Sequence, residues 1–101
     1  MSANNYQEKL NDLRDAIVNK KQIKIWVKDT PDTSGHLLDP YAILEDATMT
    51  DFIYGYNNQQ NRILLTRVSV LTKLKVMNTP FIKPDKWSED IDTKMFKVSV
   101  S

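Results

Sequence analysis

Apolar residues recur along this chain with two different spacings. Between residues 5 and 19 they return every three or four positions, with charged side chains in the gaps, as Tyr6, Leu10, Leu13 and Ile17. This period is typical of an amphipathic helix. Lys20 and Lys21 follow it, at the end where cations meet the negative pole of the helix dipole. We therefore expect a single N-terminal helix over residues 5–20.

The period then changes to strict alternation. From Gln22 to Lys28, isoleucine and valine alternate with Lys24 and Trp26, which predicts a strand with one apolar face. Residues 36–44 predict a second strand. Within it, Pro40 favours an edge position or a bulge, because proline has no N–H to donate to a neighbouring strand.

Residues 51–77 predict a β-meander, in which a strand and a turn precede two further strands. The first strand carries aromatic residues at alternate positions, Phe52, Tyr54 and Tyr56. Residues 57–61 have the small and amide side chains of a tight turn, and residues 63–76 return to a β-branched and aliphatic pattern. Gly55 predicts a bulge or the close approach of another backbone or a ligand. We expect this meander to carry most of the core.

The remainder of the chain reads as an arm. Asn78 and Pro80 turn the chain, and a proline-stiffened segment follows, with apolar residues near its end that can dock back on the sheet or on a partner. A chain of 101 residues has room for one domain. We expect this domain to comprise a helix (5–20), a β region (22–77) and a C-terminal arm (78–101).

Charge is unevenly distributed, although the formal net charge is only +1. Six acids and no Lys or Arg lie between Asp29 and Asp51, whereas no acid lies between Phe52 and Pro84. The cations of the second stretch are Arg62, Arg67, Lys73, Lys75 and Lys83. This asymmetry predicts a surface that faces an anion, without the overall basic excess of a non-specific nucleic-acid binder.

Arginine is the favoured residue for such a surface, because guanidinium binds phosphate or carboxylate through two hydrogen bonds. Arg62 and Arg67 are five residues apart, so they lie on opposite faces of a strand unless a bulge intervenes. Two cationic patches are consistent with the sequence: Arg62 with Lys24, and Arg67 with Lys73 or Lys75. The alternative is a solvated strand face that binds nothing.

Two further side chains are candidate ligand contacts. Trp26 lies between two lysines on the polar face of its strand, where it can stack on a ligand. The alternative is that the C-terminal segment covers it. His36 is the only histidine, and no carboxylates accompany it at the spacing of a metal site, so we predict no metal site. It is either a ligand contact or an exposed strand residue.

Catalytic machinery is not evident. The chain has no cysteine, its one histidine adjoins no nucleophile motif, and two glycines are too few for a phosphate-binding loop. We expect neither an enzyme nor a resident cofactor. The N-terminus lacks the apolar run of a signal peptide, and no segment approaches the length of a membrane span. We therefore expect a cytoplasmic protein without membrane contact.

Several segments, taken in order, resemble the WYL domain of bacterial and phage regulators. The similarity covers roughly residues 10–96 and rests mainly on two motifs, DPYAI at 39–43 and RILLTRV at 62–68. The resemblance implies a mainly β fold, an SH3-like or Sm-like small β-barrel of about five strands with an N-terminal helix. It also implies a sensor module that binds single-stranded nucleic acid or a small nucleotide-like anion and regulates transcription or phage defence.

By the same resemblance, Arg67 and Arg62 take basic positions of the family's arginine strand, and His36 falls where an arginine usually precedes the turn. We expect Trp26 or Tyr54 to stack on the ligand, with Lys24 close by. The chain departs from the family pattern at the three naming positions, which are Asp51, Phe52 and Ile53, and at Val27 and Leu64. These replacements predict a weakened ligand pocket or a different ligand specificity.

A second hypothesis comes from a different class of function. Small β domains leave strand edges that invite pairing with another chain. The protein would then be an accessory module that forms a homodimer or docks on a larger protein, and the apolar tail Met95–Val100 would supply a strand.

Overall fold

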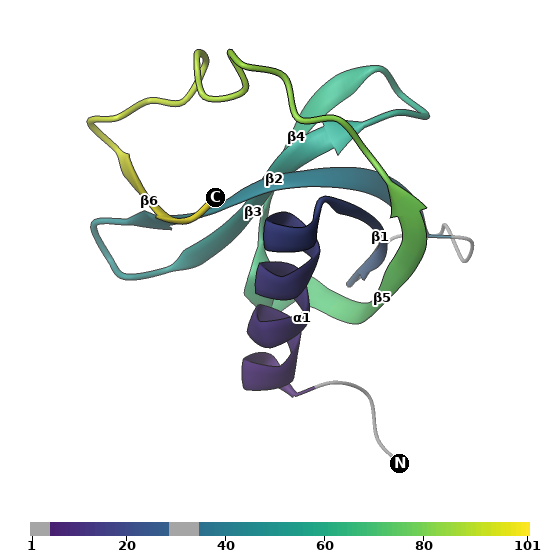
Figure 1. The fold of residues 1–101 in the computed structure, drawn as a ribbon. Coiled ribbons are helices and arrows are strands. Elements are labelled where there is room, and N and C mark those ends of the chain that lie inside the picture. Colours follow the sequence, from purple (N-terminus) through teal and green to yellow (C-terminus); the bar gives the residue numbers. More distant parts are fainter. Residues whose placement is uncertain (1–4, 29–34) are drawn as a thin grey trace.

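A computed structural model describes residues 5–28 and 35–101 of the chain (Figure 1). These residues form one helix, six strands and a short 3-10 turn, in the order α1 (Tyr6–Asn19), β1 (Lys21–Val27), β2 (His36–Asp46), β3 (Asp51–Asn57), β4 (Arg62–Arg67), η1 (Val68–Val70), β5 (Leu71–Pro80) and β6 (Phe96–Val100). The expected mainly β fold with a single N-terminal helix is confirmed.

The boundaries of α1 follow from its capping residues. The Asn5 side chain accepts a hydrogen bond from the Glu8 backbone N–H at 2.8 Å, and the Glu8 carboxylate accepts one from the Asn5 N–H at 3.2 Å. This reciprocal pair satisfies two N–H groups that lack partners within the helix. Lys20 ends the helix in the left-handed conformation, with φ of 54°. The helix therefore occupies almost the whole segment that its periodicity predicts.

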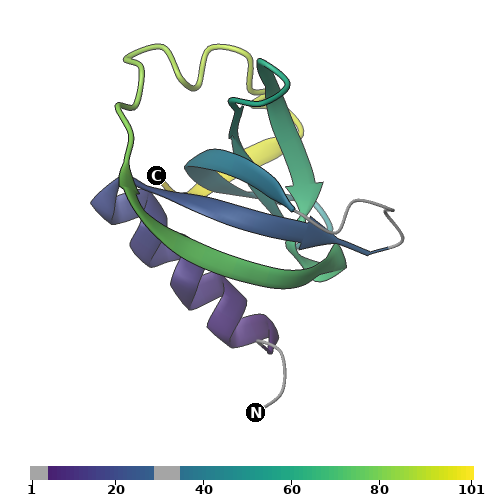
Figure 2. The same ribbon diagram turned by 90° about the vertical axis from the view of Figure 1, so that its right-hand side faces the viewer.

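The strands form one antiparallel sheet in the order β4-β3-β2-β1-β5. The first part of β2 pairs with β1, its last part pairs with β6, and β3 runs along its other side. The expected bulge is confirmed, because the β2–β3 register shifts between Pro40 and Ala42. In Figure 2, β1 and β5 run side by side above α1. No ladder among the described strands joins β4 to β5, so closure into a barrel is not established.

Both faces of this sheet are buried over β2 and β3. The inner face packs on the helix, and its core includes Leu13, Ile17, Ile23, Ile25, Leu38, Ile43, Ile53, Val68 and Leu71. The outer face packs on the C-terminal arm through Tyr41, Ala42, Leu44, Tyr54 and Phe81. Among the described residues, β2 alone contributes as many buried apolar side chains as the whole of 51–77. The expectation that the meander carries most of the core is therefore wrong, because β2 is buried from two sides.

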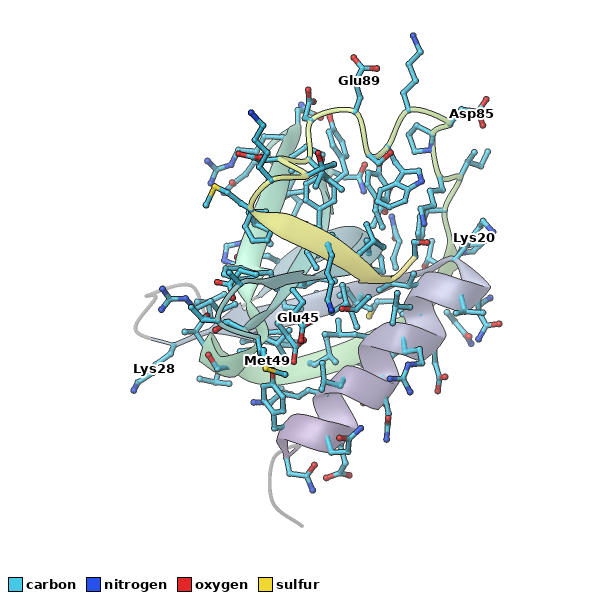
Figure 3. The ribbon with its side chains drawn as sticks, turned by 90° about the vertical axis from the view of Figure 1, so that its left-hand side faces the viewer. Lys20, Lys28, Glu45, Met49, Asp85 and Glu89 are labelled. Atoms are coloured by element: carbon cyan, nitrogen blue, oxygen red, sulfur yellow. The ribbon has the colours of Figure 1, made fainter. Side chains whose placement is uncertain are left out.

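The arm docks back on the sheet, as its apolar residues predict. After Phe81 it loops over the outer face and returns as β6 (Figure 1). The Trp87 ring lies 6.4 Å from the Tyr54 ring, and the Phe96 ring lies 5.2 Å from the Phe52 ring, centroid to centroid. Figure 3 shows Asp85 and Glu89 at the outside of this loop, pointing away from the sheet. The arm therefore presents aromatic residues inward and charged residues outward.

Gly55 is required by the close contact between β2 and β3. A Cβ at this position would lie 2.3 Å from the carbonyl oxygen of Asp39, which is far inside van der Waals contact with a backbone atom. We expect Gly55→Ala to lower the free energy of unfolding by at least about 2 kcal/mol, because the two strands must separate to admit the methyl group. Urea denaturation of this variant measures the loss.

The matched control is Ser69→Ala, at an exposed position of η1. Its free energy of unfolding should stay within about 0.5 kcal/mol of the wild-type value. A Gly55→Ala protein with the wild-type urea midpoint would show that the strands are not held this closely together.

Candidate anion-binding site

A basic strip lies on the outer face of β1 and β5, and we define it as Lys24, Trp26, Lys73 and Lys75. In the register of these strands Lys24 is opposite Lys75, and Trp26 is opposite Lys73. The residues between them, Ile23 and Ile25 on β1 and Leu74 on β5, are buried in the inner core. Because side chains alternate between the two faces of a strand, the four residues of the strip share the opposite, outward face.

The chain packs closely around Trp26. The Lys73 Nζ lies 4.8 Å from the centroid of its ring, within the range of cation–π attraction. Gly35, with φ of +80°, also lies close to the ring, since a Cβ there would be 2.8 Å from the indole Cε2 and 2.9 Å from the Lys24 Cγ. The arm packs on Tyr41 and Tyr54 and leaves Trp26 half-buried. The indole is thus fixed with a lysine on its face.

The three lysines of the strip repel one another. Lys24 and Lys75 are direct cross-strand neighbours, and no carboxylate in the described part of the chain forms an ion pair with any lysine of the strip. Like charges directly opposite on a sheet destabilise it. A multivalent anion bound across the strip would remove this repulsion, which is the main reason to regard the strip as a binding site.

The two predicted arginines lie elsewhere and on opposite faces of β4. Arg67 is opposite Phe52 on the outer face, whereas Arg62 is opposite Asn57. The β3–β4 register has no shift, so the parity expected from their spacing is confirmed. The Arg62 Nε donates a hydrogen bond to the Gln60 side chain at 2.8 Å. Neither joins the strip, because two strands separate β4 from β1 and β5 lies at the far end of the strand order.

The structure also separates His36 from the strip. His36 is opposite Ile25 in the β1–β2 register, and it has the same parity as Leu38, so it shares the inner face with them. Lys24 and Trp26 point to the outer face. His36 therefore cannot complete a site with these two residues without a change of register.

Tyr54 belongs to a second location, an aromatic pocket on the outer face of β2 and β3. This cavity of about 410 Å³ is lined by Asp39, Tyr41, Tyr54, Tyr56, Asn58, Ile63, Pro84, Lys86, Trp87 and Asp90. Tyr54 is the one predicted site residue in its wall. The alternation of Phe52, Tyr54 and Tyr56 is the sequence signal that points to this face. Nothing local indicates that Trp87 or Asp39 joins them.

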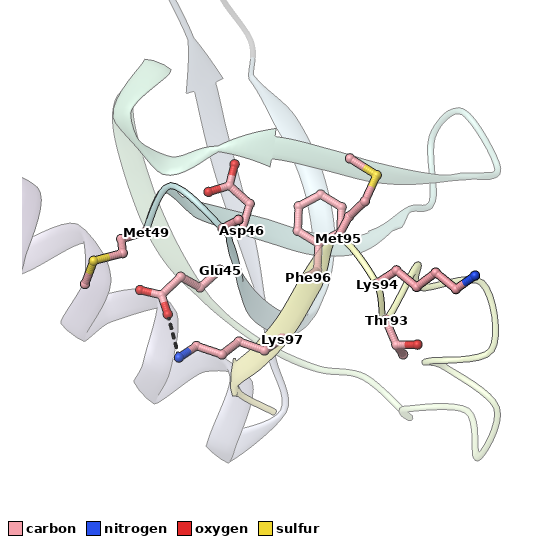
Figure 4. A pocket seen from close by; sticks show the side chains of 9 residues that line it. Glu45, Asp46, Met49, Thr93, Lys94, Met95, Phe96 and Lys97 are labelled. Atoms are coloured by element: carbon pink, nitrogen blue, oxygen red, sulfur yellow. Dashed lines mark ion pairs between the residues drawn. The ribbon is translucent and has the colours of Figure 1, made fainter.

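A third location lies between the turn after β2 and the start of β6, as Figure 4 shows. This cavity of about 430 Å³ includes Glu45 and Lys97, which form an ion pair at 3.1 Å. It also includes Asp46, whose pKa is lowered by hydrogen bonds from Thr48 and Thr50 and, to a smaller extent, by the charge of Arg67. Because its acids already have partners within the chain, this cavity is a weaker candidate than the other two.

Comparison with known proteins defines the fold. No protein-family model matches the chain, and no curated protein matches it. Among solved structures, the chain is similar to proteasome accessory factor B/C (PafBC) of Arthrobacter aurescens, with a TM-score of 0.67 and 15% sequence identity. The match covers 85% of this chain and 13% of PafBC. No helix in the described residues is long and apolar enough to cross a membrane. The chain therefore shares the fold of a small part of PafBC.

The repulsion within the strip gives a prediction about stability. We expect Lys75→Gln to raise the free energy of unfolding by about 0.2–1 kcal/mol at low salt, because it removes a like charge opposite Lys24. Added salt should reduce the gain, since it screens exposed charges. The measurement is thermal or urea unfolding at two salt concentrations. Lys94→Gln, at an exposed lysine of the arm, is the control. A loss of stability in Lys75→Gln at low salt would contradict the prediction.

Proposed function

We propose that this chain is a WYL-like regulatory module that binds single-stranded nucleic acid or a nucleotide-like anion at the basic strip, in the control of transcription or phage defence. The neighbour PafBC is a regulator that contains a WYL domain, and the fold match extends over most of this chain. We further propose that the curved sheet is an SH3-like small barrel, with η1 linking the end strands β4 and β5.

The observation that carries this proposal is the arrangement of three lysines around one indole. Phosphates that neutralise the lysines release counterions from the nucleic acid, which favours binding at low salt. A base can stack on an aromatic ring whatever its sequence, and Trp26 offers such a ring beside the charges. The strip spans only two strands, so it suits a flexible single strand or a nucleotide better than a duplex groove.

The proposal gives the four other predicted site residues no direct role. Arg62 and His36 lie on the inner face, whereas Arg67 and Tyr54 lie on the outer face of β4 and β3. They therefore serve as internal controls for the location of the site.

The first test is fluorescence anisotropy with short labelled single-stranded DNA and RNA at several salt concentrations. We expect affinity to fall with salt, and Lys75→Gln to reduce the slope of log affinity against log salt by about 0.7, the value for one phosphate contact on a single strand. Arg62→Gln, which removes a cation from the inner face, should leave the slope unchanged. If Arg67→Ala abolishes binding while Lys75→Gln does not, the site lies on β4 and the strip is excluded.

An interaction module remains the second candidate, favoured by the open edge of β4. Ile63 and Leu65 on this strand are 39% and 43% exposed. No described strand pairs with the edge of β4 that faces away from β3. Such an edge can add a strand from a second copy or from a larger protein. The tail supplies its own strand to β2 as β6, so it is already used within the chain.

Light scattering tests this second candidate. A homodimer through β4 should show twice the monomer mass and return to the monomer in Leu65→Lys, because a buried lysine on the shared edge would disfavour pairing. Thr72→Lys, at an exposed position of β5 at the other end of the strand order, is the control and should keep the dimer. A monomer mass at every concentration would exclude the homodimer.

A further inference from the structure

The aromatic pocket is lined by rings that can attract a cation, whereas the basic strip carries lysines that can attract an anion. Three of its rings stand at the corners of a nearly equilateral triangle: the centroid of Tyr41 lies 6.4 Å from that of Tyr54 and 6.5 Å from that of Trp87, and Tyr54 lies 6.4 Å from Trp87. The rings are tilted by 54° to 61° to one another. A positive charge seated over the middle of this triangle would lie within about 6 Å of all three centroids, the range of cation–π attraction.

Asp39 supplies a negative charge in the wall of the same pocket. Its side chain is only 8% exposed. One carboxylate oxygen, Oδ1, accepts hydrogen bonds from the amides of Gln22 at 2.8 Å and Asn58 at 2.9 Å. Both donors are neutral, and no cation in the described structure pairs with Asp39. Buried carboxylates in proteins are normally paired with a positive charge, so this one lacks its usual partner.

Besides Asp39, the wall of the pocket contains a second carboxylate, and its tyrosines are uncharged. Burial raises the pKa of Tyr41, and the charge of Asp39 raises it further; burial and then Asp90 raise that of Tyr54. The tyrosines therefore remain protonated. The Tyr54 hydroxyl is buried and has no hydrogen-bond partner within the described residues. Of the charged side chains in the wall, two are carboxylates, Asp39 and Asp90, and one is the ammonium of Lys86.

The chain itself places a cation on one of these rings. The Lys83 Nζ lies 4.2 Å from the centroid of the Trp87 ring. Lys83 is not part of the pocket wall, whereas Trp87 is. Trp87 therefore attracts a positive charge from the protein while still contributing to the cavity.

We propose that the aromatic pocket binds a small organic cation, an alkylated ammonium or a guanidinium, with Asp39 as its counter-ion and Tyr41, Tyr54 and Trp87 as its wall. An alkylated cation suits these apolar ring faces, which offer no ligands to replace the water shell of an inorganic ion. The volume of about 410 Å³ admits a small molecule. This site does not depend on the basic strip, which faces an anion from other strands of the sheet.

The test uses choline and its neutral isostere 3,3-dimethylbutan-1-ol, which differ in charge but hardly in shape. Each is titrated into the full chain while NMR follows the indole N–H of Trp87, which is assigned by comparison with Trp26→Phe. We expect saturable shifts with choline and with methylguanidinium, and much weaker effects with the alcohol. Equal responses to choline and the alcohol would overturn the proposal, and so would the absence of any shift at millimolar concentrations.

Three variants separate binding from folding. Asp39→Asn should weaken choline binding about tenfold or more, because it removes the buried counter-charge while an amide oxygen can still accept from Gln22. Lys86→Gln should strengthen binding about two- to threefold, because it removes a like charge at the wall. Asp85→Asn, outside the pocket on the arm (Figure 3), should leave binding unchanged.

The increase with Lys86→Gln keeps the test decisive if Asp39→Asn does not fold, since a merely structural role would not raise affinity. Weaker binding in Lys86→Gln would contradict a cationic ligand. None of these variants should change the salt dependence of oligonucleotide binding, so failure here and failure of the basic strip are distinguishable.

Discussion

The close approach of β3 to β2 at Gly55 is the contact on which the rest of the structure depends. It lies opposite Pro40, where the register shifts and β2 changes partners, from β1 on one side of the bulge to β6 on the other. β2 is thus shared among three strands. Beyond the bulge, the alternation of the strand directs neighbouring residues of β2 to different cores, Ile43 to the core with the helix and Ala42 and Leu44 to the core with the arm.

One consequence is that the outer face of the sheet carries two chemically opposed regions. Lysines that form no ion pair with any described carboxylate gather over β1 and β5, and a carboxylate that forms no ion pair with any described cation lies among aromatic rings over β2 and β3. The Gln22 side chain, on β1 beside the strip, donates to Asp39 in the pocket wall. This hydrogen bond ties Asp39 to β1, the strand that carries Lys24 and Trp26. Coupling between two ligands requires two distinct sites, and the two proposed sites lie on one sheet.

Local periodicity predicted much of the fold, because side-chain spacing reports which face a residue occupies. It located α1 and β1 and showed that Arg62 and Arg67 face opposite ways. It failed where the answer depends on distant partners. The sequence presents His36 as a ligand contact or an exposed strand residue, whereas pairing with Ile25 turns it inward. It places Asp39 in a strand, but it does not show that Gln22 and Asn58 donate to its carboxylate. Trp87 reaches Tyr41 across more than forty residues of sequence, so no spacing rule could bring them together.

The inner core and the arm are packed separately. The inner core takes no side chain from residues 81–95; of the C-terminal region, only Val100 touches it. The arm is attached instead by ring contacts and the short β6 ladder. Segments attached in this way open at a lower free energy than the core they cover. Release of the arm would remove Trp87 from the pocket and expose Tyr41 and Tyr54 while α1 and the inner sheet stayed folded, so the aromatic pocket exists only while the arm is docked.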